Sequence, residues 1–91
     1  MIVEFDKSFL KSLNKINDPL ILSKIEYIIN EFDGAKALIS IRNIKKLSGF
    51  KNYYRIKTGD YRIGVELVDS ETVRFIIIAH RKDIYRTFPK K

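Results

Sequence analysis

The chain has 91 residues and a net charge of +7, enough for one domain with a single modest core, so we expect one domain over residues 1–91. It contains no cysteine and a single histidine. This composition excludes a disulfide framework and a thiolate site and argues against zinc, so we expect no metal site. No secretory signal and no apolar run of membrane-spanning length is visible, so we expect a cytoplasmic protein without membrane contact.

The N-terminal third predicts a short edge strand over Met1–Phe5, followed by two helices. Asp6 is placed to cap the first helix, and Asp18 with Pro19 to begin the second, which Gly34 ends. Apolar residues recur at helical spacing in both segments: Phe9, Leu10, Leu13 and Ile16, then Ile21, Ile25, Ile28, Ile29 and Phe32. These stripes predict an antiparallel helical hairpin that packs on a sheet.

Residues 35–50 are less regular. Leu38, Ile41, Ile44 and Leu47 are spaced by three, which predicts a short helical turn or an irregular packed connection. Gly49 is expected to adopt a turn conformation that glycine alone takes easily.

The segment 53–85 predicts three consecutive strands and a basic end. Tyr53–Lys57, Tyr61–Val68 and Thr72–Ala79 are rich in β-branched and aromatic residues and are separated by turn residues. Two successive hairpins form an antiparallel meander. The tail, residues 86–91, is too short for a stable helix and is expected to be partly mobile. We therefore predict an α+β fold of the order β-αα-βββ, with an antiparallel sheet packed against the N-terminal helical hairpin.

The register of the first hairpin follows from side-chain chemistry. A two-residue loop at Gly59-Asp60 pairs Lys57 with Arg62 and Arg55 with Gly64, which separates the cations from the aliphatic face. In the second hairpin, a three-residue loop predicts that Val73, Phe75 and Ile77 face the core. His80 then leaves the strand on the cationic side, next to Arg81 and Tyr85.

The charge is unevenly placed along the chain. Residues 1–35 carry four lysines and six acidic residues, a balance of −2, whereas residues 36–91 carry fourteen basic and five acidic residues, a balance of +9. This asymmetry favours a polyanionic partner, either nucleic acid or an acidic protein, and the alternative is a solvated basic surface.

A succession of short motifs resembles a known family. Lys46-Leu47-Ser48-Gly49 is followed by Tyr53-Tyr54-Arg55-Ile56-Lys57, Gly59-Asp60-Tyr61-Arg62-Ile63 and His80-Arg81-Lys82-Asp83-Ile84-Tyr85. Each motif alone is weak, but the ordered set is similar to the RelE/ParE superfamily of bacterial and archaeal toxins over essentially the whole chain. The resemblance implies a RelE-like fold and a type II toxin held inactive by a cognate antitoxin, in a toxin–antitoxin hetero-oligomer.

Resemblance to the RelE branch further implies an endoribonuclease that needs no metal and no cofactor. It enters the ribosome and cleaves mRNA in the A site, inhibiting translation. The reaction is attack of a ribose 2′-OH on the adjacent phosphate. It requires a base, cations on the phosphate and an acid for the leaving 5′-oxygen.

The resemblance also implies site roles. Lys57 is the base or a phosphate-stabilising lysine, and Arg62 clamps the scissile phosphate. Arg81 stabilises the phosphate or protonates the leaving group, and Tyr85 stacks on the mRNA base. Arg55 is assigned to phosphate contact, because an arginine stays protonated and is a poor base.

Further residues have two readings. His80 is either an acid/base, a role that the resemblance implies because some branches of the family use a histidine near this place, or a structural residue that caps the strand end. Arg62 could instead form a surface ion pair with Asp60, Glu66 or Asp83. The remaining basic residues near the predicted site are expected to contact RNA phosphates: Lys51, Lys82 and Arg86.

Two other functions share this fold class. A ParE-like inhibitor of DNA gyrase would need no phosphate cradle with an aromatic beside it, so the basic set favours the nuclease. A non-catalytic RNA- or protein-binding member is the other alternative, since arginine replaces lysine at position 55 and phosphate contacts alone give binding without chemistry.

Overall fold

Five strands form one sheet in the computed structural model, which describes residues 1–89. β1 (Ile2–Phe5) lies at one edge and pairs in parallel with β5 (Thr72–His80). β4 (Tyr61–Asp69), β3 (Tyr53–Thr58) and β2 (Ile44–Lys46) follow in antiparallel pairs. The α+β prediction and the predicted edge strand are confirmed. β1 joins β5 in parallel, the one pairing that departs from the antiparallel meander.

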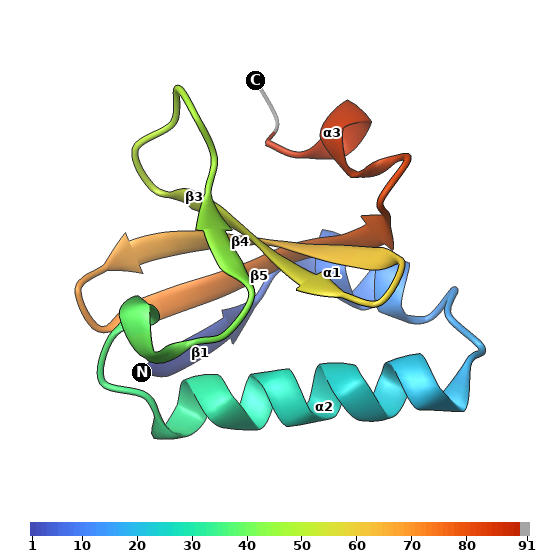
Figure 1. Ribbon diagram of the computed structural model, residues 1–91, viewed down its shortest axis with the longest axis horizontal. Helices are drawn as coiled ribbons and strands as arrows, with labels where there is room; N and C mark the ends of the chain where they lie inside the picture. The colour runs from blue at the N-terminus through green and yellow to red at the C-terminus, as the bar shows by residue number, and fades with distance from the viewer. Residues whose placement is uncertain (90–91) are drawn as a thin grey trace.

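Two helices cover one face of this sheet, α1 (Lys7–Leu13) and α2 (Pro19–Gly34) (Figure 1). Asp6 and Asp18 cap them as predicted, and each carboxylate accepts a hydrogen bond from the backbone N–H two residues on, at 3.1 and 2.9 Å. No helix among residues 1–89 is long and apolar enough to span a membrane.

The main core lies between the helices and the sheet. Rings of Phe9 and Phe32 each meet the ring of Phe75 edge-on, with centroids 5.3 Å apart, a favoured aromatic geometry. The predicted stripe of α2 is confirmed, but Leu10 of α1 is 48% exposed. On a seven-residue helix that buries Phe9, the next side chain is rotated about 100° and points to solvent.

The first hairpin has the predicted register. Lys57 pairs with Arg62 and Arg55 with Gly64 around the Gly59-Asp60 turn. In the second hairpin the register shifts at two extra residues, Val68 in β4 near the turn and Ile76 in β5.

The extra residue Ile76 changes the facing of the rest of β5. Val65 pairs with Phe75, and Gly64 with Ile77. Because the bulge adds one residue to the strand, every side chain beyond it lies on the opposite face of the sheet from the one that strict alternation predicts. The prediction that Ile77 faces the main core is therefore wrong, and Ile78, 3% exposed, takes that place.

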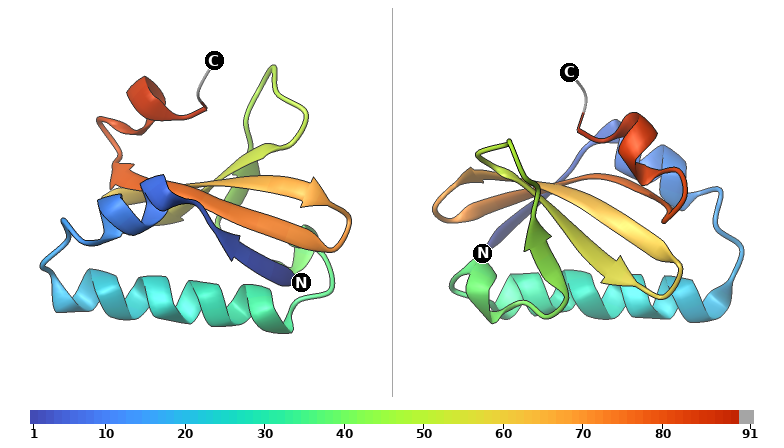
Figure 2. Two further views of the ribbon diagram at one scale, coloured as in Figure 1. Left: turned by 180° about the vertical axis from the view of Figure 1, so that it is seen from behind. Right: turned by 45° about the horizontal axis from the view of Figure 1, so that its top comes forward.

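A second apolar cluster covers part of the other face of the sheet, which we call the distal face. The short helix α3 (Ile84–Thr87) lies there, on the side away from α2 (Figure 2). Ile84 and Phe88 are fully buried against β4 and β5, and Phe88 lies directly on Gly64. The predicted mobile tail is therefore wrong for residues 86–89, while Lys90 and Lys91 lie outside the described residues.

The connection between α2 and β3 contains more structure than predicted. Leu38–Ser40 forms the expected helical turn, and Gly49 has the expected positive φ, +82°. The strand β2 was not predicted, because three residues are too few to show an alternating pattern.

Candidate functional site

On the distal face, the three adjacent strands β2, β3 and β4 carry four cations: Lys45, Arg55, Lys57 and Arg62. A fifth cation of this face, Arg74 of β5, forms an ion pair with Glu66. Lys45 of β2 pairs with Arg55 of β3, and Lys57 of β3 pairs with Arg62 of β4. Paired residues in antiparallel strands lie on the same side of the sheet, and alternation puts all four on the distal face. The sequence predicted Arg55, Lys57 and Arg62 there. Lys45 was missed because β2 was missed, and its only signal is the basic pair at positions 45 and 46.

These four distal-face cations are not neutralised by neighbouring acids. The ion pairs among residues 1–89 join Arg74 to Glu4 (3.0 Å) and to Glu66 (3.4 Å), and Arg86 to Asp83 (3.9 Å). Like charges directly opposite each other across a strand pair are destabilising. The sheet therefore holds two repulsive pairs side by side, an arrangement that a bound anion would relieve.

Arg62 is oriented by the hairpin turn. Its Nη1 donates to the carbonyl oxygens of Gly59 (3.0 Å) and Tyr61 (2.9 Å). None of the ion pairs within the described part of the chain involves Arg62, so the surface-pair alternative is not what the structure shows. One guanidinium nitrogen is fixed by carbonyls, which leaves Nε and Nη2 as donors for a ligand.

Arg81 is attached to the same turn through its backbone. Its N–H donates to the carbonyl oxygen of Asp60 at 2.8 Å, so the chain leaving β5 runs beside the β3–β4 turn that holds Arg62. The Arg81 side chain is exposed. The structure thus brings two of the arginines predicted to contact phosphate, Arg62 and Arg81, to one corner of the sheet.

Tyr85 lies on α3 and is 62% exposed. Its neighbours Ile84 and Phe88, four residues apart, occupy the helix face that contacts the sheet. The Tyr85 ring is therefore not needed in the core and is accessible to a ligand.

His80 lies on the face opposite the distal-face cations, so its prediction on the cationic side is wrong. It pairs with Tyr61, and the two rings meet edge-on at 5.8 Å on the helix-covered face. The extra residue at Ile76 causes this inversion. His80 Nδ1 accepts a hydrogen bond from the Lys82 backbone N–H at 3.2 Å, which supports the structural reading, a cap of the strand end next to Arg81.

We expect His80→Asn to keep most activity of the site, because an asparagine oxygen can accept the same N–H two residues on. His80→Ala leaves that N–H without its side-chain acceptor, and about 1 kcal/mol of stability should be lost in urea unfolding. An essential acid/base would behave differently: His80→Asn would then slow the catalysed reaction by about 10²–10⁴-fold.

The other predicted phosphate contacts are peripheral. Lys51, Lys82 and Arg86 are all exposed, Lys51 in the β2–β3 loop and the other two at α3. Arg86 lies near Asp83, whose carboxylate offsets part of its charge. Among residues 1–89, no group of three or more potential ligands could hold a metal ion.

The fold and the distal-face cations define a small α+β protein with one basic sheet face, and comparison with known proteins gives its family. Residues 3–85 match the family described as ParE toxin of type II toxin-antitoxin system, parDE. Toxin RelE3 of Methanocaldococcus jannaschii is 42% identical over 90 residues, which cover 98% of this chain and 100% of that protein. The chain therefore belongs to the RelE/ParE family of type II toxins, as the resemblance implied.

Solved structures agree. In the RelB-RelE antitoxin-toxin complex from Methanococcus jannaschii, one chain is 40% identical with a TM-score of 0.80, covering 94% of this chain and 99% of that one. The archaeal RelE-RelB complex from Pyrococcus horikoshii gives a TM-score of 0.70 at 17% identity, over 88% of this chain and 93% of that one. The second likeness shows the shared fold alone.

Proposed function

We propose that this protein is a ribosome-dependent endoribonuclease that cleaves mRNA in the A site and thereby inhibits translation. The observation that carries the proposal is the pair of unneutralised, like-charged couples Lys45–Arg55 and Lys57–Arg62 on one open sheet face. Such a face attracts a polyanion and can stabilise charge that builds on a phosphate.

The chemistry follows from what each group can do. The base takes the proton of the 2′-OH, whose oxygen bonds to phosphorus as the bond to the 5′-oxygen breaks, leaving a cyclic 2′,3′-phosphate. Lys57 is the candidate base, since a lysine amine can act as a general base whereas an arginine stays protonated. Arg62 and Arg81 contact the phosphate oxygens, and Arg81 or a water protonates the leaving 5′-oxygen. Tyr85 stacks on the adjacent base.

The experiment is to map mRNA 5′ ends on programmed 70S ribosomes incubated with the purified protein, beside the same RNA without ribosomes. A cut within the A-site codon that requires the ribosome is the expected result. Cleavage of the RNA in the sample without ribosomes would indicate a nuclease that does not work through the A site. An intact message in both samples would overturn the proposal.

Gyrase inhibition is the second candidate, because the family that matches residues 3–85 is described as ParE toxin. A supercoiling assay with DNA gyrase tests it directly. Loss of supercoiling together with an intact message would assign the protein to that activity.

We further propose a cognate antitoxin as partner, in a cytoplasmic toxin–antitoxin hetero-oligomer with the ribosome and mRNA as targets of the free toxin. The complexes solved for the relatives support the partner, and the excess positive charge favours an acidic or amphipathic segment of it. The product of the neighbouring gene should bind more tightly than an unrelated acidic peptide in a titration, and equal affinities would contradict this.

A further inference from the structure

A groove of about 290 Å³ lies at the uncovered edge of β3, between that strand and α2. Seven residues line it: Lys24, Tyr27 and Ile28 from α2, Asn43 before β2, and Lys57, Thr58 and Gly59. Lys57 also belongs to the distal-face cations. Lys57 lies where the two surfaces meet, because β2 begins at Ile44 and, beyond the Lys57 N–H that Asn43 accepts, no described strand pairs with this edge of β3. The groove is therefore continuous with the candidate site.

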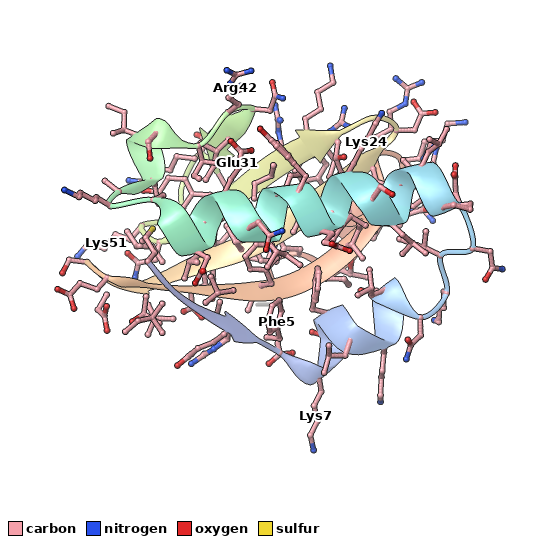
Figure 3. The ribbon with its side chains drawn as sticks, turned by 90° about the horizontal axis from the view of Figure 1, so that it is seen from below. Phe5, Lys7, Lys24, Glu31, Arg42 and Lys51 are labelled. Atoms are coloured by element: carbon pink, nitrogen blue, oxygen red, sulfur yellow. The ribbon has the colours of Figure 1, made fainter. Side chains whose placement is uncertain are left out.

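The lining side chains have complementary chemistry. Tyr27 is 57% exposed, which leaves its ring free for stacking. Lys24 and Lys57 form no ion pair with any described residue. Figure 3 shows Lys24 on the side of α2 that faces the strands. A groove lined by an aromatic ring and two ammonium groups suits a base with its flanking phosphates.

Asn43 contributes a hydrogen-bonding edge. Its backbone has a positive φ, +61°, and its carbonyl oxygen accepts the Lys57 N–H at 3.1 Å, which fixes the residue at the mouth of the groove. Asparagine tolerates this conformation better than most residues. Its amide offers both donors and an acceptor, the groups that contact base edges.

The groove ends at acidic side chains. Beyond Tyr27, Glu26 and Glu31 line a neighbouring hollow on the same helix, and carboxylates there repel a phosphate backbone. A strand that enters from the distal face therefore cannot continue along α2, which limits the occupant to about one nucleotide.

We infer that this groove binds one nucleotide of single-stranded RNA, next to the nucleotide held on the distal face. The inference deepens the proposed function and rests on it for the RNA substrate. The base stacks on Tyr27, Asn43 contacts its edge, and Lys24 and Lys57 hold its flanking phosphates.

The test is the affinity of a fluorescent six-nucleotide RNA, measured by anisotropy at several salt concentrations, for the full chain and its variants. Tyr27→Ala should weaken binding about tenfold through lost stacking, and Tyr27→Phe should not. Lys24→Ala should lower the slope of log K against log salt by about 0.7, the value for one phosphate contact on a single strand. Lys7→Ala is the matched control, because Lys7 projects from α1 away from the sheet (Figure 3).

Each outcome has one meaning for the groove. Affinities of the Tyr27→Ala and Lys24→Ala variants equal to that of Lys7→Ala would overturn the inference, as would no binding by the unsubstituted protein. If Tyr27→Ala weakened the binding of a hexaglutamate peptide as much as it weakened the binding of the RNA, the groove would be assigned to an acidic protein instead. A-site cleavage is measured in parallel. If RNA binding depends on Tyr27 but no cleavage occurs, the proposed function is rejected while the inference that the groove binds RNA is retained.

Discussion

Replacing Gly64 with alanine is expected to lower the free energy of unfolding by about 1–3 kcal/mol, a cost typical of overpacking. The added Cβ would lie 2.6 Å from both Cδ2 and Cγ of the Phe88 ring. Phe88 is only 1% exposed and has little room to move within the second apolar cluster. Either β4 shifts or the ring moves away from the sheet, and both changes loosen the packing of α3.

Urea unfolding followed by far-UV circular dichroism measures this loss, and Gly34→Ala is the matched control. Gly34 lies at the end of α2, where an added methyl carbon would have no other heavy atom within 4 Å and where φ is not positive. Alanine there should therefore be neutral or slightly stabilising. Equal effects of the two substitutions would contradict the close contact.

A double-mutant cycle locates the effect. Phe88→Ala alone should cost about 3–5 kcal/mol, the usual value for a buried phenylalanine. In that background Gly64→Ala should cost much less, because the atoms it would meet are gone, so the two effects are not additive. Trypsin should also cut faster after Lys82 or Arg86 in Gly64→Ala, since a loosened α3 exposes those bonds.

The register of the first hairpin could be predicted because charged and apolar residues alternate along both of its strands. Arg55, Lys57 and Arg62 alternate with aliphatic residues, so only one register keeps the cations out of the core, and the structure has that register. In β5 the run 76–79 is aliphatic throughout. Whichever of these side chains point to the main core, apolar atoms are buried there. The bulge, and the resulting position of His80 on the helix-covered face, therefore could not be predicted from the sequence pattern.

The buried C-terminal segment was missed for a different reason. Phe88 is buried by residues distant in sequence, and so short a tail carries no periodicity of its own. One signal was available: Gly64 sits between the β-branched residues Ile63 and Val65 inside a strand, where glycine often marks a close approach of another segment. The position of Lys45 could not be predicted for the same reason, since its place among the distal-face cations depends on its pairing with Arg55 in another strand.

Replacing Arg62 or Arg81 with alanine is expected to slow single-turnover A-site cleavage by about 10²–10³-fold each, the usual loss when one donor to a developing negative charge is removed. Both residues are held at the β3–β4 turn, Arg62 by carbonyls of the turn and Arg81 by its backbone bond to Asp60. The Arg62 guanidinium is therefore held in place before the substrate arrives, and the Arg81 side chain starts from a backbone position that is already fixed. Cleavage on programmed ribosomes at saturating protein measures the rate, with Lys7→Ala as the control that removes one positive charge from the far side.

Two further variants separate this role from general electrostatic attraction. Arg62→Lys keeps the charge, but a lysine cannot donate to two turn carbonyls and present a planar pair of donors to a phosphate, so it should restore little activity. The Arg62→Ala, Arg81→Ala double variant should lose less than the product of the single losses if both side chains contact one phosphate. Full activity of Arg62→Lys, or losses that appear only at subsaturating protein, would instead mean that the arginines attract RNA without stabilising the transition state.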